Sequence, residues 1–178
     1  MRYINDDNIQ NENNITIISL NIANLLSKLR FLKLFINNVT TAKNKPDIIM
    51  IVETHVTESA NLGLTPQELR NIIPGYHLYH RGRESKKGGG VGILVSDRLN
   101  SEVEILELAR FQEEQFENIV VKIPNAVHTD NKSSNKDLVL VPIYRQPNNS
   151  NLDTFTFELE KLLSKIDKRK NEIILAGD

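Results

Sequence analysis

A run of five apolar residues, Ile48 to Val52, constrains the fold of this chain more than any other stretch of its sequence. A short, uninterrupted apolar run is typical of a strand buried on both faces, as in a sheet covered by helices. Pro46, just before the run, ends the preceding helix. Glu53 follows the run directly, at the carboxyl end of the strand, where open α/β sheets place their sites. The same position also suits the first solvated residue after a core strand.

The composition indicates one globular domain or a part of one. The chain has 178 residues, of which 39% are hydrophobic and 25% are charged, and its formal net charge is -1. This balance gives no general attraction to nucleic acid or to a membrane surface, so any anion site has to be local. The sequence has no cysteine, which excludes disulfides and thiolate metal sites.

The first 14 residues are polar and rich in asparagine, and we expect a disordered leader there rather than a signal peptide. No apolar stretch is long enough to cross a membrane. We therefore expect an intracellular protein, nuclear or cytoplasmic, that is not secreted and has no membrane partner. The folded domain is expected over residues 15–178.

The first half of this domain predicts two parallel strands joined by a helix. Residues 15–21 are rich in β-branched side chains and favour a strand. From Leu25 to Val39 the apolar residues recur at helical spacing, which predicts an amphipathic helix. With the strand over 47–53, this order gives a parallel pair with a crossover. Thr65 and Pro66 predict the capped start of a short helix.

The second half predicts strands that are joined mostly by loops, which favours antiparallel pairing. Strands are predicted over residues 76–80, 91–96, 103–108, 115–123, 138–145 and 172–176. In the strand over 115–123, alternation would place Phe116 on one side and Glu117 and Asn118 on the other, with some blurring. Ser150 and Asp153 have the spacing of a capping box and open a second long helix.

Four of the predicted strands end in polar groups, and in one layered sheet such ends can converge on one rim. The residues are Asn21, Glu53, Tyr144 with Arg145, and Asp178. Glu53 and Asp178 would supply hard oxygen ligands, which suit magnesium. Asn21 could orient a metal-bound water or a phosphate oxygen. Tyr144 and Arg145 could donate hydrogen bonds to phosphate oxygens.

Five short pieces of the sequence, in this order, resemble the endonuclease/exonuclease/phosphatase family. They are Ser19–Asn21, Val52–His55, Gly88–Ile93, Ile143–Asn148 and Leu175–Asp178, and the stretch 115–122 is similar to the family's middle strand. The greatest similarity is to the apurinic-type endonuclease domain of non-LTR (LINE-type) retrotransposons, from about residue 15 onward. The resemblance implies a layered α/β sandwich of the DNase I-like type with mixed sheets.

The resemblance also implies roles for individual residues. Asn21 and Glu53 correspond to a metal-site asparagine and glutamate, and Tyr144 to a tyrosine that contacts phosphate. Asp178 corresponds to an aspartate that handles the attacking water beside the metal. The implied cofactor is Mg²⁺ (or Mn²⁺) and the implied substrate is DNA. The implied reaction is a nick that exposes a 3′ hydroxyl to prime a reverse transcriptase, which would follow as a downstream domain of the full-length protein.

Parts of the family pattern are missing from these 178 residues. No asparagine follows Gly177–Asp178, and no residue corresponds to the family's late aspartate or to its acid/base histidine. We therefore expect a truncated domain that is the N-terminal part only, with little or no nicking activity. We also expect its second sheet to be missing, a broad apolar face to be exposed, and Asp178 to lie at a frayed terminus.

The loop from Arg81 to Lys87 is the densest basic segment, with Arg81, Arg83, Lys86 and Lys87. It is either a solvated loop or a set of contacts to DNA phosphates that act most strongly at low salt. Gly88 to Gly90 fit no Walker-type phosphate loop. We interpret these glycines as allowing close backbone packing where the next strand begins.

Other interpretations stay open at this point. His55, two residues after Glu53, is a metal ligand or an ordinary surface histidine, whereas His77 and His80 are structural or exposed and His128 is inert. The function could be that of a phosphoinositide or other phosphomonoester phosphatase of the same fold. It could also be that of a non-catalytic remnant that binds nucleic acid through residues 81–87, or binds nothing.

Overall fold

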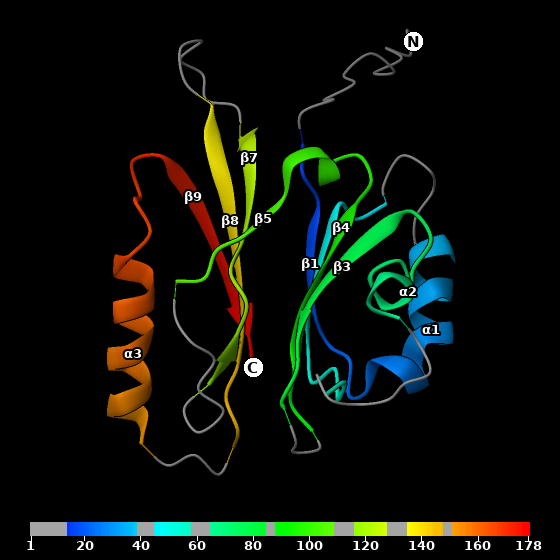
Figure 1. The fold of residues 1–178 in the computed structure, drawn as a ribbon, viewed down its shortest axis with the longest axis horizontal. Coiled ribbons are helices and arrows are strands. Elements are labelled where there is room, and N and C mark those ends of the chain that lie inside the picture. Colours follow the sequence, from blue (N-terminus) through cyan, green and yellow to red (C-terminus); the bar gives the residue numbers. More distant parts are fainter. Residues whose placement is uncertain are drawn as a thin grey trace, which may run out of the picture.

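The protein folds as two β-sheets packed face to face with helices on the outside (Figure 1). This computed structural model describes residues 14–38, 45–57, 65–84, 88–108, 116–127, 135–147 and 151–178. Helices α1 (Leu25–Asn38) and α2 (Pro66–Arg70) lie on the outer side of one sheet, and α3 (Leu152–Ser164) lies on the outer side of the other. The layered α/β sandwich with mixed sheets that the family resemblance implies is confirmed. The expected leader lies outside the described residues, apart from Asn14.

The first sheet contains the buried strand that organises the sequence. Its order is β1 (Ile17–Asn21), β2 (Ile48–Val52), β4 (Val91–Ser96) and β3 (Tyr76–Arg81). β1 and β2 run parallel and are joined through α1, so the predicted parallel pair with a crossover is confirmed. β4 runs antiparallel to both of its neighbours.

The second sheet has five strands, and β8 (Lys136–Tyr144) is its centre. On one side β8 pairs antiparallel with β6 (Glu117–Asn118) and β7 (Val121–Val127), and β7 pairs with β5 (Glu104–Ile105). On the other side it pairs in parallel with β9 (Asn171–Gly177), which it reaches through α3. The expectation of a missing second sheet was therefore wrong, because these strands already cover the inner face of the first sheet.

Strands β6 and β7 correspond to the single strand predicted over 115–123. Both keep one register against β8, with Glu117 opposite Tyr144 and Val121 opposite Leu140. Polar and apolar residues are buried together here, since Glu117 and Asn118 are as enclosed as Phe116. The Glu117 carboxylate is therefore buried at one end of the sandwich, where it requires a counter-charge or hydrogen-bond donors.

The five residues of β2 are all buried, as predicted, because they alternate between two apolar layers. Ile48, Met50 and Val52 point into the layer between the sheets, and Ile49 and Ile51 point into the layer under α1. A third layer lies between the second sheet and α3. Burial of an aliphatic side chain of this size contributes about 1.5–3 kcal/mol. β2 is thus a rigid element, and the residues at its two ends are held firmly.

The helices begin at polar side chains that accept bonds from free backbone N–H groups. Thr65 caps α2 and forms a capping box with Glu68, so the predicted helix start is confirmed. Asn151, rather than Ser150, caps α3, accepting a bond from the Thr154 N–H at 3.0 Å. Ser150 lies outside the described residues. Within the described part of the chain, none of the helices is both long enough and apolar enough to traverse a membrane.

Candidate functional site

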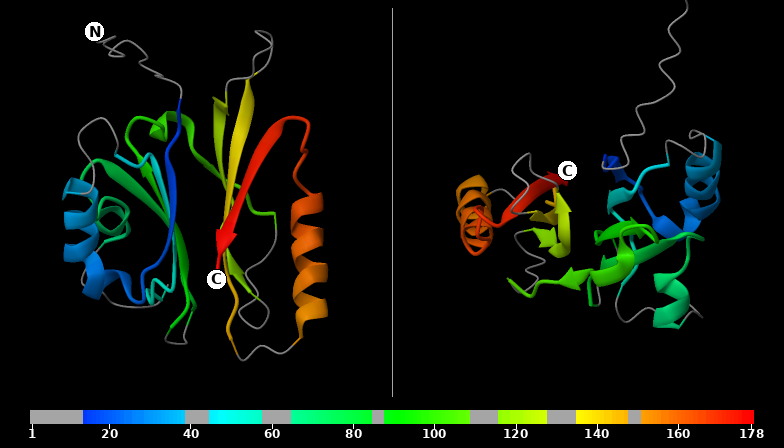
Figure 2. Two further views of the ribbon diagram at one scale, coloured as in Figure 1. Left: turned by 180° about the vertical axis from the view of Figure 1, so that it is seen from behind. Right: turned by 90° about the horizontal axis from the view of Figure 1, so that it is seen from above.

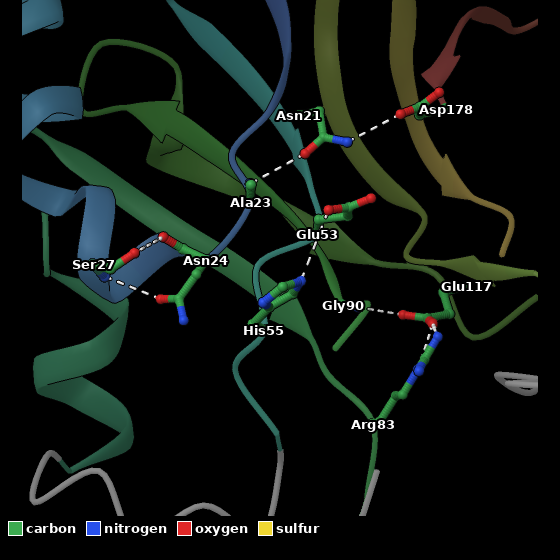
Figure 3. A network of polar contacts seen from close by, with 10 residues as sticks. All are labelled: Asn21, Ala23, Asn24, Ser27, Glu53, His55, Arg83, Gly90, Glu117 and Asp178. Atoms are coloured by element: carbon green, nitrogen blue, oxygen red, sulfur yellow. Dashed lines mark hydrogen bonds and ion pairs between the residues drawn. The ribbon is translucent and has the colours of Figure 1, made fainter. Parts of the chain in front are cut away.

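The ends of β1 and β9 bring two of the predicted site residues into direct contact. Asn21, the last residue of β1, donates a hydrogen bond from Nδ2 to Oδ2 of Asp178, which follows β9, at 3.0 Å (Figure 3). β1 belongs to the first sheet and β9 to the second, and the two strands lie side by side (Figure 2). The two sheets therefore meet at this point through polar side chains from residues 157 positions apart.

The backbone of Asp178 is fixed by the end of β8. Its N–H donates to the carbonyl of Ile143 at 3.1 Å, and its carbonyl accepts from the N–H of Arg145 at 2.9 Å. These bonds continue the parallel pairing of β8 and β9 beyond Gly177. The expected frayed position of Asp178 was wrong, because the neighbouring strand supplies partners for both of its backbone groups.

Glu53 leaves β2 in an unusual backbone conformation that its neighbours hold. Its φ is 55°, in the left-handed region that costs a non-glycine residue on the order of 1–3 kcal/mol. Its carbonyl accepts from the Asn24 N–H at 2.8 Å, and the next N–H, of Thr54, donates to the carbonyl of Gly90 at 3.2 Å. This turn aims the Glu53 side chain toward the junction of the sheets beside Asn21 (Figure 3).

Tyr144, the last residue of β8, lies against Glu53 from the opposite sheet. Burial raises the pKa of the Tyr144 hydroxyl, and the negative charge of Glu53 and a hydrogen bond to it raise that pKa further. The phenol consequently stays protonated at neutral pH and is available as a hydrogen-bond donor.

The structure thus brings Asn21, Glu53, Tyr144 and Asp178 together at one end of the sandwich. Asn21 is opposite Val52 in the parallel register, so Glu53 comes next to it. Their roles in binding or catalysis remain predictions. We name the set of these four residues the carboxylate rim.

The donor atoms of the carboxylate rim fit a hard, partly hydrated cation. Its two carboxylates and one amide oxygen are oxygen donors, which Mg²⁺ prefers, and Mg²⁺ commonly uses only one or two carboxylates and keeps several waters. Among the residues that the structure describes, no group of three or more His, Cys, Asp or Glu side chains is arranged to hold a metal. A set of two carboxylates and one amide suits a cation that shares its coordination with water and substrate.

Two histidines contact the segment Glu53–Thr54. His55 Nε2 is 3.8 Å from Glu53 Oε2 (Figure 3), which leaves both of its predicted alternatives open. His80 Nε2 is 2.9 Å from the Thr54 hydroxyl, and burial lowers the pKa of His80 to about 4, so its ring is neutral at neutral pH. His77 lies 3.2 Å from Asp97 at the other end of β3, and His128 lies outside the described residues.

The arginines of the predicted basic segment are held by carboxylates. Arg81 makes an ion pair with Glu107 at 2.8 Å. Arg83 is only 4% exposed and pairs with Glu117, which is 1% exposed. The guanidinium of Arg83 is thus enclosed and ion-paired, and its predicted contact to substrate phosphate remains a prediction.

The remaining cations of that prediction have different positions. Lys86 and Lys87 lie outside the described residues, so their predicted contacts to phosphate remain predictions. Arg145 lies with its guanidinium 5.5 Å from the centre of the Phe155 ring. Its backbone N–H binds Asp178, as described above, so Arg145 adjoins the carboxylate rim through its main chain.

The amino-acid sequence matches the profile of a known protein family. The profile of the Endonuclease/Exonuclease/phosphatase family matches residues 18–178, nearly the whole chain. The chain belongs to this family. Comparison with curated protein sequences gives no significant match.

Several solved structures share the fold at low sequence identity. The 3′-5′ exonuclease NExo from Neisseria meningitidis matches with a TM-score of 0.59 and 17% identity, over 92% of this chain and 56% of that one. An AP endonuclease from Archaeoglobus fulgidus matches with 0.57 and 19%, over 93% and 57%. TDP2 from D. rerio matches with 0.56 and 20%, over 92% and 60%. The chain thus spans less than two thirds of the length of each of these proteins.

Glu117, a residue beside the site, is not among the residues that the sequence predicts. The signal was present, because a carboxylate inside the apolar stretch Phe116–Ile123 requires a buried counter-charge. Arg83, in the basic segment that precedes the three glycines, is that counter-charge. The interpretation of the glycines is confirmed for two of them, since a Cβ atom on Gly89 would overlap the Glu117 carboxylate and one on Gly90 would overlap the Thr54 hydroxyl. A Cβ atom on Gly88 would make only an ordinary contact.

Proposed function

We propose that the carboxylate rim is the metal-binding part of a centre that hydrolyses phosphodiester bonds in DNA with Mg²⁺ or Mn²⁺. The observation that carries the proposal is the contact between the two sheets at this rim. Asn21 binds Asp178 there, and Glu53 and Tyr144 lie directly beside this pair. A divalent cation bound at the rim would polarise the scissile phosphate and stabilise the leaving oxygen.

Each residue of the rim has a distinct part in this proposal. Glu53 and Asp178 hold negative charge where the cation would bind, and Asn21 keeps the Asp178 carboxylate oriented through its 3.0 Å bond. Tyr144, protonated because its pKa is raised, donates a hydrogen bond to a phosphate oxygen. Asp178 also positions the attacking water and accepts its proton.

The proposed reaction breaks the bond between phosphorus and the 3′ oxygen of the DNA strand. The water oxygen forms a new bond to phosphorus and stays on the 5′ phosphate. The departing 3′ oxygen takes up a proton and becomes a 3′ hydroxyl. We expect little turnover from the 178-residue chain, since no residue in it corresponds to the acid/base histidine implied by the family resemblance.

DNA is the favoured substrate class for two reasons. A Neisseria 3′ phosphatase with the same fold was solved with a product DNA hairpin, and D. rerio TDP2 was solved with a single-stranded DNA product. The stretch from Ile143 to Asn148 resembles retrotransposon endonucleases. We therefore propose an intracellular, nuclear or cytoplasmic endonuclease of a LINE-type retrotransposon, with a reverse transcriptase further along the full-length protein.

The retrotransposon origin is tested by the genomic reading frame that contains this sequence. We expect it to continue with any residue and then Asn after Asp178, to encode an Asp-His pair later, and to enter a polymerase domain after that. A stop codon or an unrelated domain at that place would contradict this part of the proposal and leave the metal site untouched.

The metal site is tested by titrating the chain with Mn²⁺ and measuring the free ion by electron paramagnetic resonance. We expect one site that Mg²⁺ competes for and that Glu53→Gln removes. Asp47→Asn, at the other end of β2, is the matched control and is expected to bind normally. Binding that persists in Glu53→Gln would contradict the proposal.

A phosphatase function is the second candidate, because solved structures with this fold include a 3′ phosphatase and a 2′,3′-cyclic phosphatase. Supercoiled plasmid, a 3′-phosphorylated oligonucleotide and a phosphoinositide can be compared with the same protein and Mn²⁺. Release of phosphate without plasmid nicking would favour the phosphatase, whereas nicking that chelator abolishes would favour the endonuclease.

A further inference from the structure

We propose that the buried pair Arg83–Glu117 is a positioning device for Glu53, acting through the peptide group between Gly89 and Gly90. The inference rests on the proposed metal-binding role of Glu53. It assigns a part in the site to two residues outside the carboxylate rim.

The pair is completely enclosed at the junction of the two sheets. Arg83 Nε donates to Glu117 Oε1 at 2.6 Å, and the Arg83 Nη2 group binds the same oxygen. With its amide placed so that oxygen faces the guanidinium, Gln146 accepts from Arg83 Nη1 at 2.7 Å. The pair thus links the segment after β3, the strand β6 and the segment after β8.

The second oxygen of Glu117 holds the peptide group between the two glycines. Glu117 Oε2 accepts from the N–H of Gly90 (Figure 3), and the carbonyl of that same peptide, on Gly89, accepts from the N–H of His55 at 2.8 Å. Both glycines have positive φ, 64° and 85°, and no side chain resists rotation of this peptide. Glu117 therefore determines which way the Gly89 carbonyl points.

The glycine peptide in turn fixes the backbone that follows Glu53. His55 and Thr54 donate their N–H groups to Gly89 and Gly90 respectively. Glu53, one residue earlier, is held at a φ of 55°. A residue in a left-handed conformation of this kind persists only when its surroundings over-determine it. The chain of bonds from Glu117 through the glycines supplies one side of that restraint.

The position of the pair also matches a role at the site. Glu117 is directly opposite Tyr144 in the register of β6 and β8, and Tyr144 contacts Glu53. A buried ion pair is a weak source of stability, since apolar side chains of similar volume often replace it without loss. The pair does, however, orient a peptide group beside the proposed metal ligand, and apolar side chains in its place could not do this.

The test compares two neutral double variants of the full chain. R83M/E117Q retains a side-chain oxygen for the Gly90 N–H, whereas R83M/E117L removes it at similar volume. We measure Mn²⁺ affinity, urea unfolding, and hydrogen exchange of the Thr54 and His55 amides by NMR. We expect R83M/E117L to fold, to bind Mn²⁺ about tenfold more weakly or worse, and to lose protection at these two amides. R83M/E117Q is expected to retain both properties to a greater degree.

Two controls make each outcome decisive. R98M/D47N removes an ion pair at the far end of β2 and should lower stability without changing Mn²⁺ affinity. Should R83M/E117L fail to fold, R83M/E117M takes its place, and failure of both while R83M/E117Q folds would overturn the proposal, because the pair would then act on the fold alone.

The exchange measurement separates this proposal from the proposed function. If the wild type binds no Mn²⁺, the metal site fails, and amide protection alone decides whether Glu117 positions this backbone. Equal affinity and equal protection in the two double variants would overturn the positioning role, whatever the wild type binds.

Discussion

A carboxylate lies at each end of β2, and the two carboxylates differ in burial and in their bonding partners. Asp47, directly before the strand, is only 8% exposed and accepts bonds from the Thr16 N–H and from Arg98 Nε, both at 2.9 Å. Glu53, directly after the strand, is partly exposed and contacts the Tyr144 hydroxyl. Its ion pair is with His55, at the longer distance of 3.8 Å.

This difference separates a structural carboxylate from a binding one. The charge of Asp47 is matched by a guanidinium, so that end of the strand is closed. At the other end, Asp178 from the second sheet adds a second negative charge near Glu53 (Figure 3). Carboxylates that gather without a matching arginine or lysine bond keep their capacity to bind a cation.

The largest expected effect is on metal binding at the Glu53 end. Glu53→Gln should weaken Mn²⁺ binding by more than about 100-fold, beyond the loss typical of residues outside the metal's own ligands. Its free energy of unfolding should be unchanged or higher, because one of two neighbouring negative charges is removed. Spin-resonance titration and urea unfolding measure the two quantities. A drop in stability with intact binding would place Glu53 in the same class as Asp47.

A fall in pH should also lower the free energy of unfolding, through protonation of His80, which lies beside Thr54 at the Glu53 end of β2. The pKa of His80 is about 4 in the folded chain against 6.5 in the unfolded one, so only the unfolded chain gains a proton between these values. The stabilising effect of the neutral ring is therefore complete above pH 6.5 and is lost as the pH falls to about 4. The upper limit of this loss is about 3 kcal/mol. Urea unfolding at several pH values measures it, and His80→Asn should flatten the profile in this window.

Asp47→Ala should have the converse profile to the Glu53 variant. The Thr16 N–H and Arg98 lose their acceptor, and we expect the free energy of unfolding to fall by about 2 kcal/mol. Mn²⁺ affinity should stay at the wild-type value, since the change lies at the opposite end of a rigid strand. A parallel loss of metal binding would show that the two ends are coupled and would break the comparison.

The smallest expected effect is that of Tyr144→Phe. Removal of one hydroxyl donor should weaken the binding of a 5′-phosphorylated dinucleotide in the presence of Mg²⁺ by about fivefold, which corresponds to about 1 kcal/mol. Mn²⁺ affinity should change less than this. NMR titration of the dinucleotide measures the loss, and unchanged binding would remove Tyr144 from the phosphate contacts.

Much of the fold could be predicted because local patterns decided it. The apolar run in β2, the helical spacing in α1 and the Thr65 cap each predicted the observed element. The second sheet could not be predicted from the missing family segments, since strands β5 to β9 suffice to build it. The pairing of β9 with β8 joins strands that are separated in the sequence by α3, and no local pattern specifies such a pairing.

For the candidate site, the sequence by itself determined which strands end in polar groups and what chemistry those groups offer. Only the tertiary structure decided that Asn21 binds Asp178, that Glu53 contacts Tyr144, and that Arg83 and Glu117 neutralise each other out of solvent. The physical reason is that the effect of a charge depends on its partners and burial. Here the partners come from a different sheet, or from strands far apart in the chain.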